Sequence, residues 1–261
     1  MQAPPSPPGS ASAAAEPRLP LLDALRGLAM LWMTAFHLAF DLNHFGLMPP
    51  QRFLDDAFWT GQRVAILSIF LFCAGAGQAV AQAQSVSWPR FWRRWRLLLG
   101  AAVLVSAGSA LMFPQRWISS GVLHGLLLMV LGARLLAPAC RGRRGDLLLP
   151  LLALTAFVLP LLWSSPWFDS RWTWWIGLGT HKPPTEDHVP LLPWSGVLLL
   201  GLWAGRLVLR RRTEGEMAAG SPGPVTRPVR ALAWLGRHSL GYYLLHQPVL
   251  IAALTAWTAL A

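Results

Sequence analysis

Two residues suited to proton transfer stand four positions apart near the N-terminus. His37 and Asp41 lie within residues 21–42, which are otherwise mostly apolar. If this stretch is a helix, residues four apart share one face, so the two side chains lie close together. A carboxylate that stabilises a protonated imidazole makes a histidine an effective general base. We therefore predict that His37, oriented by Asp41, removes a proton from a substrate; the alternative is that His37 only packs between helices.

A second pair of ionisable residues lies at the start of the same stretch. Asp23 and Arg26 are three positions apart and share a helix face. An ion pair is the simplest interpretation. A guanidinium group also binds phosphate in a bidentate manner, so Arg26 is a candidate for contact with an anionic ligand. About 21 Å of helix separates Asp23 from His37, which places the two pairs near opposite ends.

Two further apolar stretches each contain a histidine, His124 in residues 118–138 and His246 in residues 239–259. Ionisable residues inside membrane-spanning segments are costly and are functional candidates by default. Depth along the predicted helices sorts the candidates into two levels. The outer level comprises His37, Asp41, His124, Asp187 and His188. The inner level comprises Asp23, Arg26, Arg237 and His246. Two polar levels suit a protein that takes a ligand from one side and delivers to the other.

The composition indicates a membrane protein. Of the 261 residues, 54% are hydrophobic and 13% are charged, whereas a soluble domain carries about 25% charged residues. The net charge of +11 is no argument for nucleic acid here, because an arginine excess in an apolar chain marks cytoplasmic loops. Cys73 and Cys140 lack the spacing of a zinc site or a disulfide framework, so no metal is expected.

The elements that position these residues are seven predicted membrane-spanning helices. Each needs about 20 mostly apolar residues. They cover residues 21–42, 62–82, 95–113, 118–138, 146–164, 193–209 and 239–259. The predicted fold class is therefore all-α, a polytopic membrane helix bundle. Gly75 and Gly77 indicate that the second helix packs closely against a neighbour.

The remaining segments define the domain organisation. Residues 1–17, rich in Pro, Ser and Ala, are predicted to be a disordered tail, and residues 18–261 a single transmembrane domain. Residues 213–229 are predicted to be a cytoplasmic linker between the sixth and seventh helices. With the N-terminus inside, the outer loops hold few basic residues: Arg52, Arg63, Arg116, Arg171 and Lys182. The positive-inside rule thus predicts an N-inside, C-outside arrangement.

Four segments in order along the chain resemble one family. They are RLPLLDALRGLAMLWMTAFHLAFDL (Arg18–Leu42), ISSGVLHGLLLMVLGARLL (Ile118–Leu136), DHVPLLPWSGVLLLGLWAGRL (Asp187–Leu207) and LGRHSLGYYLLHQPVLI (Leu235–Ile251). Together they resemble the catalytic-domain family of heparan-alpha-glucosaminide N-acetyltransferase, and most of all its short bacterial members. These belong to a broader set of multi-span membrane acyltransferases.

The resemblance implies acyl transfer across a membrane, with cytosolic acetyl-CoA as the co-substrate. Asp23, Arg26 and Gly27 match the DxxRG opening of the family, and His37 and Asp41 match the HxxxDL of its bacterial members. A bacterial member implies a multi-pass protein of the cytoplasmic (inner) membrane. Its acceptor on the external side would be an amino sugar or an envelope glycan.

The candidate site follows from these arguments. The predicted catalytic residues are His37, Asp41 and His124. The predicted acetyl-CoA contacts are Arg26, Asp23, His246 and Arg237. The predicted acceptor contacts are Asp187, His188 and Trp194. Direct transfer and an acetyl-histidine intermediate both fit, and homo-oligomerisation is left open. Two other functional classes remain: a proton-coupled or solute transporter, and a structural membrane partner whose polar residues only pair helices.

Overall fold

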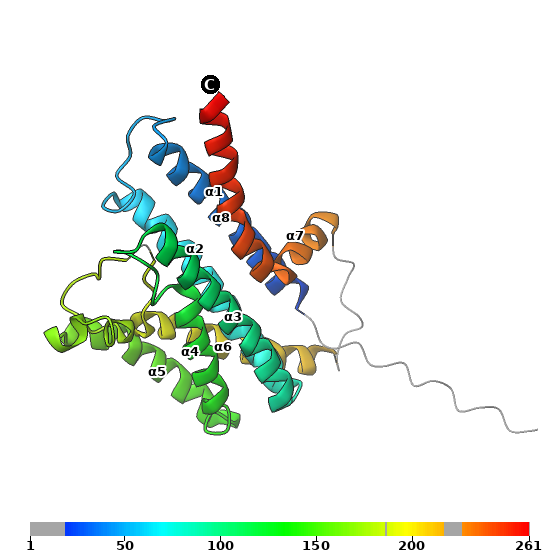
Figure 1. Cartoon of the computed structure of the whole chain (residues 1–261). Coiled ribbons are helices and arrows are strands. Elements are labelled where there is room, and N and C mark those ends of the chain that lie inside the picture. Colours follow the sequence, from blue (N-terminus) through cyan, green and yellow to red (C-terminus); the bar gives the residue numbers. More distant parts are fainter. Residues whose placement is uncertain (1–18, 186, 217–225, 261) are drawn as a thin grey trace, which may run out of the picture.

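The computed structural model describes residues 19–185, 187–216 and 226–260, and these confirm an all-α fold. The described residues form eight α-helices: α1 (Pro20–His44), α2 (Ala57–Ala83), α3 (Trp88–Met112), α4 (Val122–Leu136), α5 (Gly142–Leu162), α6 (Leu191–Glu216), α7 (Arg227–Arg237) and α8 (Ser239–Leu260). Two short 3-10 helices, η1 (Pro166–Asp169) and η2 (Trp174–Ile176), lie between α5 and α6 (Figure 1). The predicted tail, residues 1–17, lies outside the described residues.

Six of the described helices are long and apolar enough to cross a membrane: α1, α2, α3, α5, α6 and α8. Many of their leucines face outward, among them Leu111, Leu161 and Leu162. Such side chains are stable only against lipid, because no polar solvent favours so many exposed apolar groups. The chain is therefore a multi-pass membrane protein, as its composition predicts.

The predicted span at residues 118–138 is a shorter helix than expected. Helix α4 has 15 residues, about 22 Å of rise, against about 30 Å of hydrocarbon. It begins late because the backbone of Ser120 is paired with His188 in an isolated β-bridge. The carboxylate of Asp187 then accepts a hydrogen bond from the Val122 amide at the first turn. A distant loop thus decides where α4 begins.

Close backbone packing joins α2 to α6. A Cβ on Gly75 would collide with the backbone carbonyl of Leu198, so the helices can approach only because this residue is a glycine. This confirms the prediction for Gly75. Gly77 has a different neighbour: a Cβ there would lie 3.6 Å from Nη2 of Arg26. The largest buried side chains, including Leu71 and Leu198, surround this contact.

Helix α7 is not among the predicted helices. The predicted linker, residues 213–229, overlaps the end of α6 and the start of α7, and its residues 217–225 lie outside the described part of the chain. The helix packs along the first turns of α1 through two glycines: Gly236 meets the backbone of Asp23, and Gly27 meets the backbone of Leu232. Figure 1 shows α7 beside the N-terminal end of α1, next to the start of α8.

Arginines tie several helix ends together. Arg134 donates to the carbonyl of Val86, between α2 and α3. Arg206 donates to the carbonyl of Gly142, at the start of α5. These contacts bring the α2–α3 connection, the α4–α5 connection and the C-terminal half of α6 to one end of the bundle. This agrees with the predicted arrangement, in which the arginine-rich loops lie on one side of the membrane. That this end faces the cytoplasm stays a prediction.

Candidate functional site

A pair of histidines, His37 of α1 and His246 of α8, lies at the contact between these two helices. Their ring centroids are 5.1 Å apart at an interplanar angle of 61°. His246 is 9% exposed, and His37 is half-buried. We call these two residues the histidine pair.

The position of His246 corrects the sequence interpretation, which assigned it to the inner level with Arg26. Depth was counted for each helix from its own end. Gly236, just before α8, packs against Asp23 and Gly27 of α1. Helix α8 therefore begins at the level of the second turn of α1. The first two turns of α8 therefore reach the second half of α1, and His246 lies beside His37.

His246 has the hydrogen-bond pattern of a general base. Its Nδ1 donates to the backbone carbonyl of Tyr243 at 2.8 Å, because a carbonyl can only accept. In the neutral ring the proton is thus on Nδ1 and a lone pair is on Nε2. Nε2 is buried and has no hydrogen-bond partner among the described residues. A buried nitrogen of this kind is costly unless a ligand supplies the missing donor.

Asp41 is held by α8 and not by His37. Both of its carboxylate oxygens accept from Nε2 of Gln247, at 2.9 and 3.1 Å, and the residue is 4% exposed. Among the described residues no hydrogen bond joins Asp41 to His37, so the predicted orientation of His37 by Asp41 stays a prediction. Asp41 therefore anchors α8 against α1, directly beside the histidine pair. Oε1 of Gln247 is buried and, like Nε2 of His246, lacks a described partner.

Two adjacent tyrosines flank His246. The ring of Tyr242 is parallel to that of His246, with centroids 6.0 Å apart and an interplanar angle of 3°. Its hydroxyl donates to Oγ1 of Thr34 at 2.6 Å, because Thr34 uses its own hydroxyl proton for the carbonyl of Met30. The ring of Tyr243 lies 5.9 Å from His246. The imidazole of His246 is thus held between two rings.

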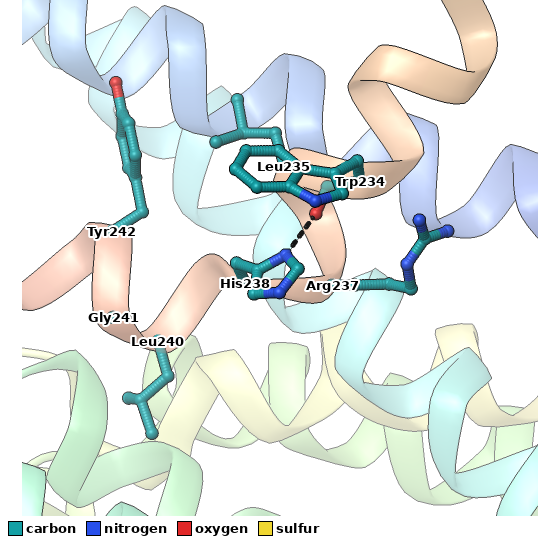
Figure 2. Close-up of a pocket in the computed structure, with 7 residues that line it drawn as sticks. All are labelled: Trp234, Leu235, Arg237, His238, Leu240, Gly241 and Tyr242. Atoms are coloured by element: carbon teal, nitrogen blue, oxygen red, sulfur yellow. Dashed lines mark hydrogen bonds between the residues drawn. The ribbon is translucent and has the colours of Figure 1, made fainter.

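A cavity of about 400 Å³ lies at the junction of α7 and α8, and we call it the α7–α8 cavity (Figure 2). Its lining comprises Trp234, Leu235, Arg237, His238, Leu240, Gly241 and Tyr242. Nδ1 of His238 donates to the carbonyl of Trp234 at 2.8 Å. Figure 2 shows Tyr242 and Arg237 on opposite sides of Trp234 and His238. Since Tyr242 also stacks on His246, this cavity lies one side chain from the histidine pair.

Asp23 and Arg26 form the ion pair that their spacing indicates. Nη1 of Arg26 donates to Oδ1 of Asp23 at 3.2 Å, and Nη2 donates to the carbonyl of Cys73 on α2, also at 3.2 Å. Gly77 of α2 faces the same guanidinium group, and a Cβ there would contact Nη2 at an ordinary van der Waals distance. Arg26 therefore ties α1 to α2, while the exposed Arg237 borders the α7–α8 cavity.

A second cavity, of about 330 Å³, lies between α3, α4 and the segment that precedes α6; we call it the α3–α4 cavity. Its lining comprises Trp95, Ser119, Ser120, His124, Gly125, Leu127, Leu128, Trp175 and Val189. Nε2 of His124 lies 3.0 Å from Oγ of Ser106, which donates its own proton to the carbonyl of Ile118. His124 therefore donates from Nε2 and keeps a lone pair on Nδ1. That atom and Oγ of Ser119 are buried without a described partner.

Asp187 and His188 support one wall of the α3–α4 cavity. Oδ2 of Asp187 accepts from the Val122 amide at 2.8 Å, and Nδ1 of His188 lies 2.9 Å from Oγ of Ser120. Burial raises the pKa of Asp187, while the Val122 amide and the charges of Arg63 and Lys182 oppose the rise. Burial, together with the charge of Lys182, lowers the pKa of His188 to about 4. His188 is thus a neutral, structural hydrogen-bond partner near pH 7.

The predicted acceptor contacts are therefore separated. Asp187 and His188 lie behind the wall of the α3–α4 cavity, while Trp194 packs against the core around Leu198. Trp175, from the tryptophan-rich stretch 165–192 that the sequence offers as a cap over a site, lines the cavity instead. The sequence signal for it was the density of tryptophans between α5 and α6.

Tyr243 connects the two halves of the site. Its ring contacts His246 and packs against the cluster that contains Leu123 and Leu127. Leu127 also lines the α3–α4 cavity. The predicted outer level is thus divided in two: His37 and Asp41 lie with His246, and the remaining residues lie at the α3–α4 cavity. In the described part of the chain, no group of three or more His, Cys, Asp or Glu residues is placed to hold a metal ion.

Comparison with known proteins agrees with the sequence motifs. A family model described as "Heparan-alpha-glucosaminide N-acetyltransferase, catalytic" matches residues 18–248. This confirms the resemblance that the four segments carry. A search of curated proteins found no match, and a search of solved structures found none.

Proposed function

The chain belongs to the heparan-alpha-glucosaminide N-acetyltransferase catalytic-domain family, and on this premise we propose that it is a membrane acyltransferase. It moves an acyl group, acetyl in the first instance, from acyl-CoA to an amine or hydroxyl of a sugar. The membrane is the cytoplasmic membrane of a bacterium, with the acceptor, an amino sugar or envelope glycan, on the external side.

One observation carries this proposal: the buried, unpartnered Nε2 of His246 beside His37, among membrane-spanning helices. Leaving such an atom without a donor costs about 1–3 kcal/mol. A folded protein tolerates that cost where a substrate supplies the donor. An acceptor hydroxyl or amine is such a donor.

The histidine pair performs the proton transfer. Nε2 of His246 takes the proton of the acceptor as its oxygen or nitrogen attacks the thioester carbonyl of acyl-CoA. The new C–O or C–N bond forms, the C–S bond breaks, and the thiolate of CoA leaves with the proton returned by the imidazole. His37 is the second candidate for this base, and Asp41 with Gln247 keeps α1 and α8 in register around it.

The α7–α8 cavity is suited to the CoA end of the donor. Arg237 and His238 offer cationic and hydrogen-bonding groups for phosphate. Trp234 and Tyr242 offer aromatic surface for the rest of the molecule. Tyr242 joins this cavity to His246, so a donor held here has a short path to the histidine pair. Asp23 and Arg26 support this region through the α1–α2 contact.

The test is transfer of labelled acetyl from acetyl-CoA by protein reconstituted in nanodiscs, with a panel of amino sugars and envelope glycan fragments. We expect transfer by the native protein and loss of transfer in His246→Gln. His44→Gln is the matched control, because His44 lies on α1 but is exposed at its far end. We also expect acetyl-CoA to raise the melting temperature; a ligand at 100 times its Kd adds about 2.7 kcal/mol.

Two results would contradict the proposal. One is the absence of any acetyl-CoA-dependent stabilisation at millimolar ligand. The other is solute uptake into proteoliposomes that needs no acyl-CoA, which would favour the transporter class.

A further inference from the structure

The α3–α4 cavity has a lining without charged side chains, although the chain carries a net charge of +11. Its lining combines apolar groups, such as Leu128 and Val189, with three hydroxyl or imidazole groups from Ser119, Ser120 and His124. Its volume of about 330 Å³ lies at the small end of ligand pockets, roughly 300–1,000 Å³. It therefore has room for one small ring.

Its two tryptophans present their rings and not their N–H groups. Nε1 of Trp95 donates to the carbonyl of Leu127 at 3.0 Å, and Nε1 of Trp175 donates to the carbonyl of Trp172 at 2.7 Å. With both donors used inside the protein, the indoles offer apolar surface to an occupant. Aromatic surface beside isolated polar groups fits a molecule with C–H faces and hydroxyl edges.

The unpartnered polar atoms have complementary chemistry. His124 keeps its proton on Nε2 for Ser106, so its Nδ1 is an acceptor. Oγ of Ser119, also unpartnered, both donates and accepts. An occupant that donates one hydrogen bond and accepts another satisfies both. Neutral hydroxyl groups do this without carrying a charge out of water.

The charge around the cavity disfavours a cationic occupant. Oδ2 of Asp187, beside the cavity-supporting His188, already accepts a hydrogen bond from the Val122 amide. The positive charges of Arg63 and Lys182 act on that same carboxylate. Among the described residues that line the cavity there is no carboxylate, so an ammonium group would enter the low-dielectric site without an anionic partner in its lining, which is costly.

We propose that the α3–α4 cavity binds an uncharged monosaccharide ring, so that the acceptor group of the transfer is a hydroxyl and the product an ester. This rests on the proposed function and narrows its acceptor from any sugar to a neutral one. The acceptor oxygen forms a bond to the acyl carbon as the C–S bond of acyl-CoA breaks, and its proton passes through the imidazole to the CoA thiolate. Tyr243, which contacts both His246 and the cluster beside the cavity, joins the bound ring to the site of proton transfer.

Binding is the first measurement, because it does not depend on turnover. Native protein in nanodiscs, free of glycoside detergents, is titrated with methyl β-D-glucopyranoside and with the methyl glycoside of glucosamine. We expect the neutral glycoside to bind more tightly. Trp175→Ala and Ser119→Ala should each weaken it about fivefold, the size of one lost packing or hydrogen-bond contact. Trp172→Ala is the matched control, because the side chain of Trp172 is 86% exposed and its backbone carbonyl remains.

The bond type of the product is the second measurement. Labelled acetyl esters are released by neutral hydroxylamine, whereas amides resist it, so we expect the transferred label to be released. Tighter binding of the glucosamine glycoside, unchanged neutral-sugar binding in both cavity variants, or a hydroxylamine-resistant product would each overturn the inference. Trp175→Phe keeps a ring at the site and should restore most of the binding, which separates loss of the pocket from misfolding. An amide product overturns the neutral acceptor and leaves the acyltransferase assignment intact. Neutral-sugar binding without acetyl-CoA-dependent stabilisation or transfer removes that assignment and keeps the pocket.

Discussion

The histidine pair and the histidines near the α3–α4 cavity are held in different ways. His124 and His188 are each fixed by a serine hydroxyl, from Ser106 and Ser120 respectively. His246 instead donates to a carbonyl three residues earlier on its own helix, and His37 makes ring contacts only within the described structure. Rings fixed from outside are suited to positioning a ligand. The unpartnered Nε2 of His246 instead lies on a ring beside a second imidazole, an arrangement suited to exchanging a proton.

The sharpest test of this difference substitutes one histidine from each region. His246→Gln removes the proton acceptor and should lower kcat about 100- to 10,000-fold, the usual contribution of a general base. His124→Gln should mainly raise the KM for the acceptor. Steady-state kinetics with acetyl-CoA and a sugar acceptor separate the two effects. Equal losses of kcat in both variants would break the distinction.

The next largest effect is on stability in the α1–α8 region. Asp41→Ala leaves Nε2 of Gln247 without its carboxylate partner, and we expect about 1–3 kcal/mol of destabilisation. Gln247→Leu in the same background should restore part of it, because neither partner is then left unpaired. Thermal unfolding in nanodiscs, followed by intrinsic fluorescence, measures both. A double variant no more stable than Asp41→Ala would argue against this anchor.

A smaller effect, in the other region, is a pH dependence. The pKa of His188 falls from 6.5 unfolded to about 4 in the folded protein. As the pH falls, His188 is protonated in the unfolded chain before it is protonated in the folded protein. The stability that neutral His188 provides is therefore present above pH 6.5 and is lost as the pH falls towards 4. In His188→Gln the melting temperature should depend less on pH between about 4 and 6.5. An unchanged slope would show that His188 is not buried in its neutral form.

The smallest expected effect comes from loosening one serine anchor. Ser106→Ala removes the partner of His124 Nε2 and should cost about 1 kcal/mol, seen as an acceptor KM raised about fivefold. The acetyl-CoA KM should stay unchanged, since Ser106 is not among the described residues that line the α7–α8 cavity. A larger change in the KM for acetyl-CoA than in the KM for the acceptor would contradict the proposal that the two cavities bind different substrates.

The sequence allowed the long helices to be predicted because a bilayer imposes a length and an apolar composition on each of them. Helix α7 escaped prediction because Arg227, Arg230 and Arg237 make it amphipathic and not apolar. The short α4 depends on the pairing of Ser120 with His188, which are 68 residues apart. Such long-range pairing has no local signal.

The sequence indicated which polar residues lie within the helices, but not which of them lie next to one another. His37, Asp41 and His124 are candidates because ionisable groups are costly in lipid. Asp41 and His124 make side-chain hydrogen bonds, whereas His37 contacts the ring of His246. The partner of Asp41 was missed because Gln247 is 206 positions away, although a His–Gln dipeptide within an apolar helix was a visible signal. His246 was assigned to the wrong level because depth along one helix says nothing about the stagger between two.

Helices α7 and α8 are separated by the single residue His238, and this has a mechanical consequence. With so short a joint, α8 acts as a lever whose fulcrum is the contact of Gly236 with α1. His246 lies seven residues beyond Ser239, the first residue of α8, about 11 Å along the helix axis. A small tilt at the joint is therefore magnified at the imidazole. The spacing of the two rings in the histidine pair thus depends on a backbone contact between Gly236 and Gly27.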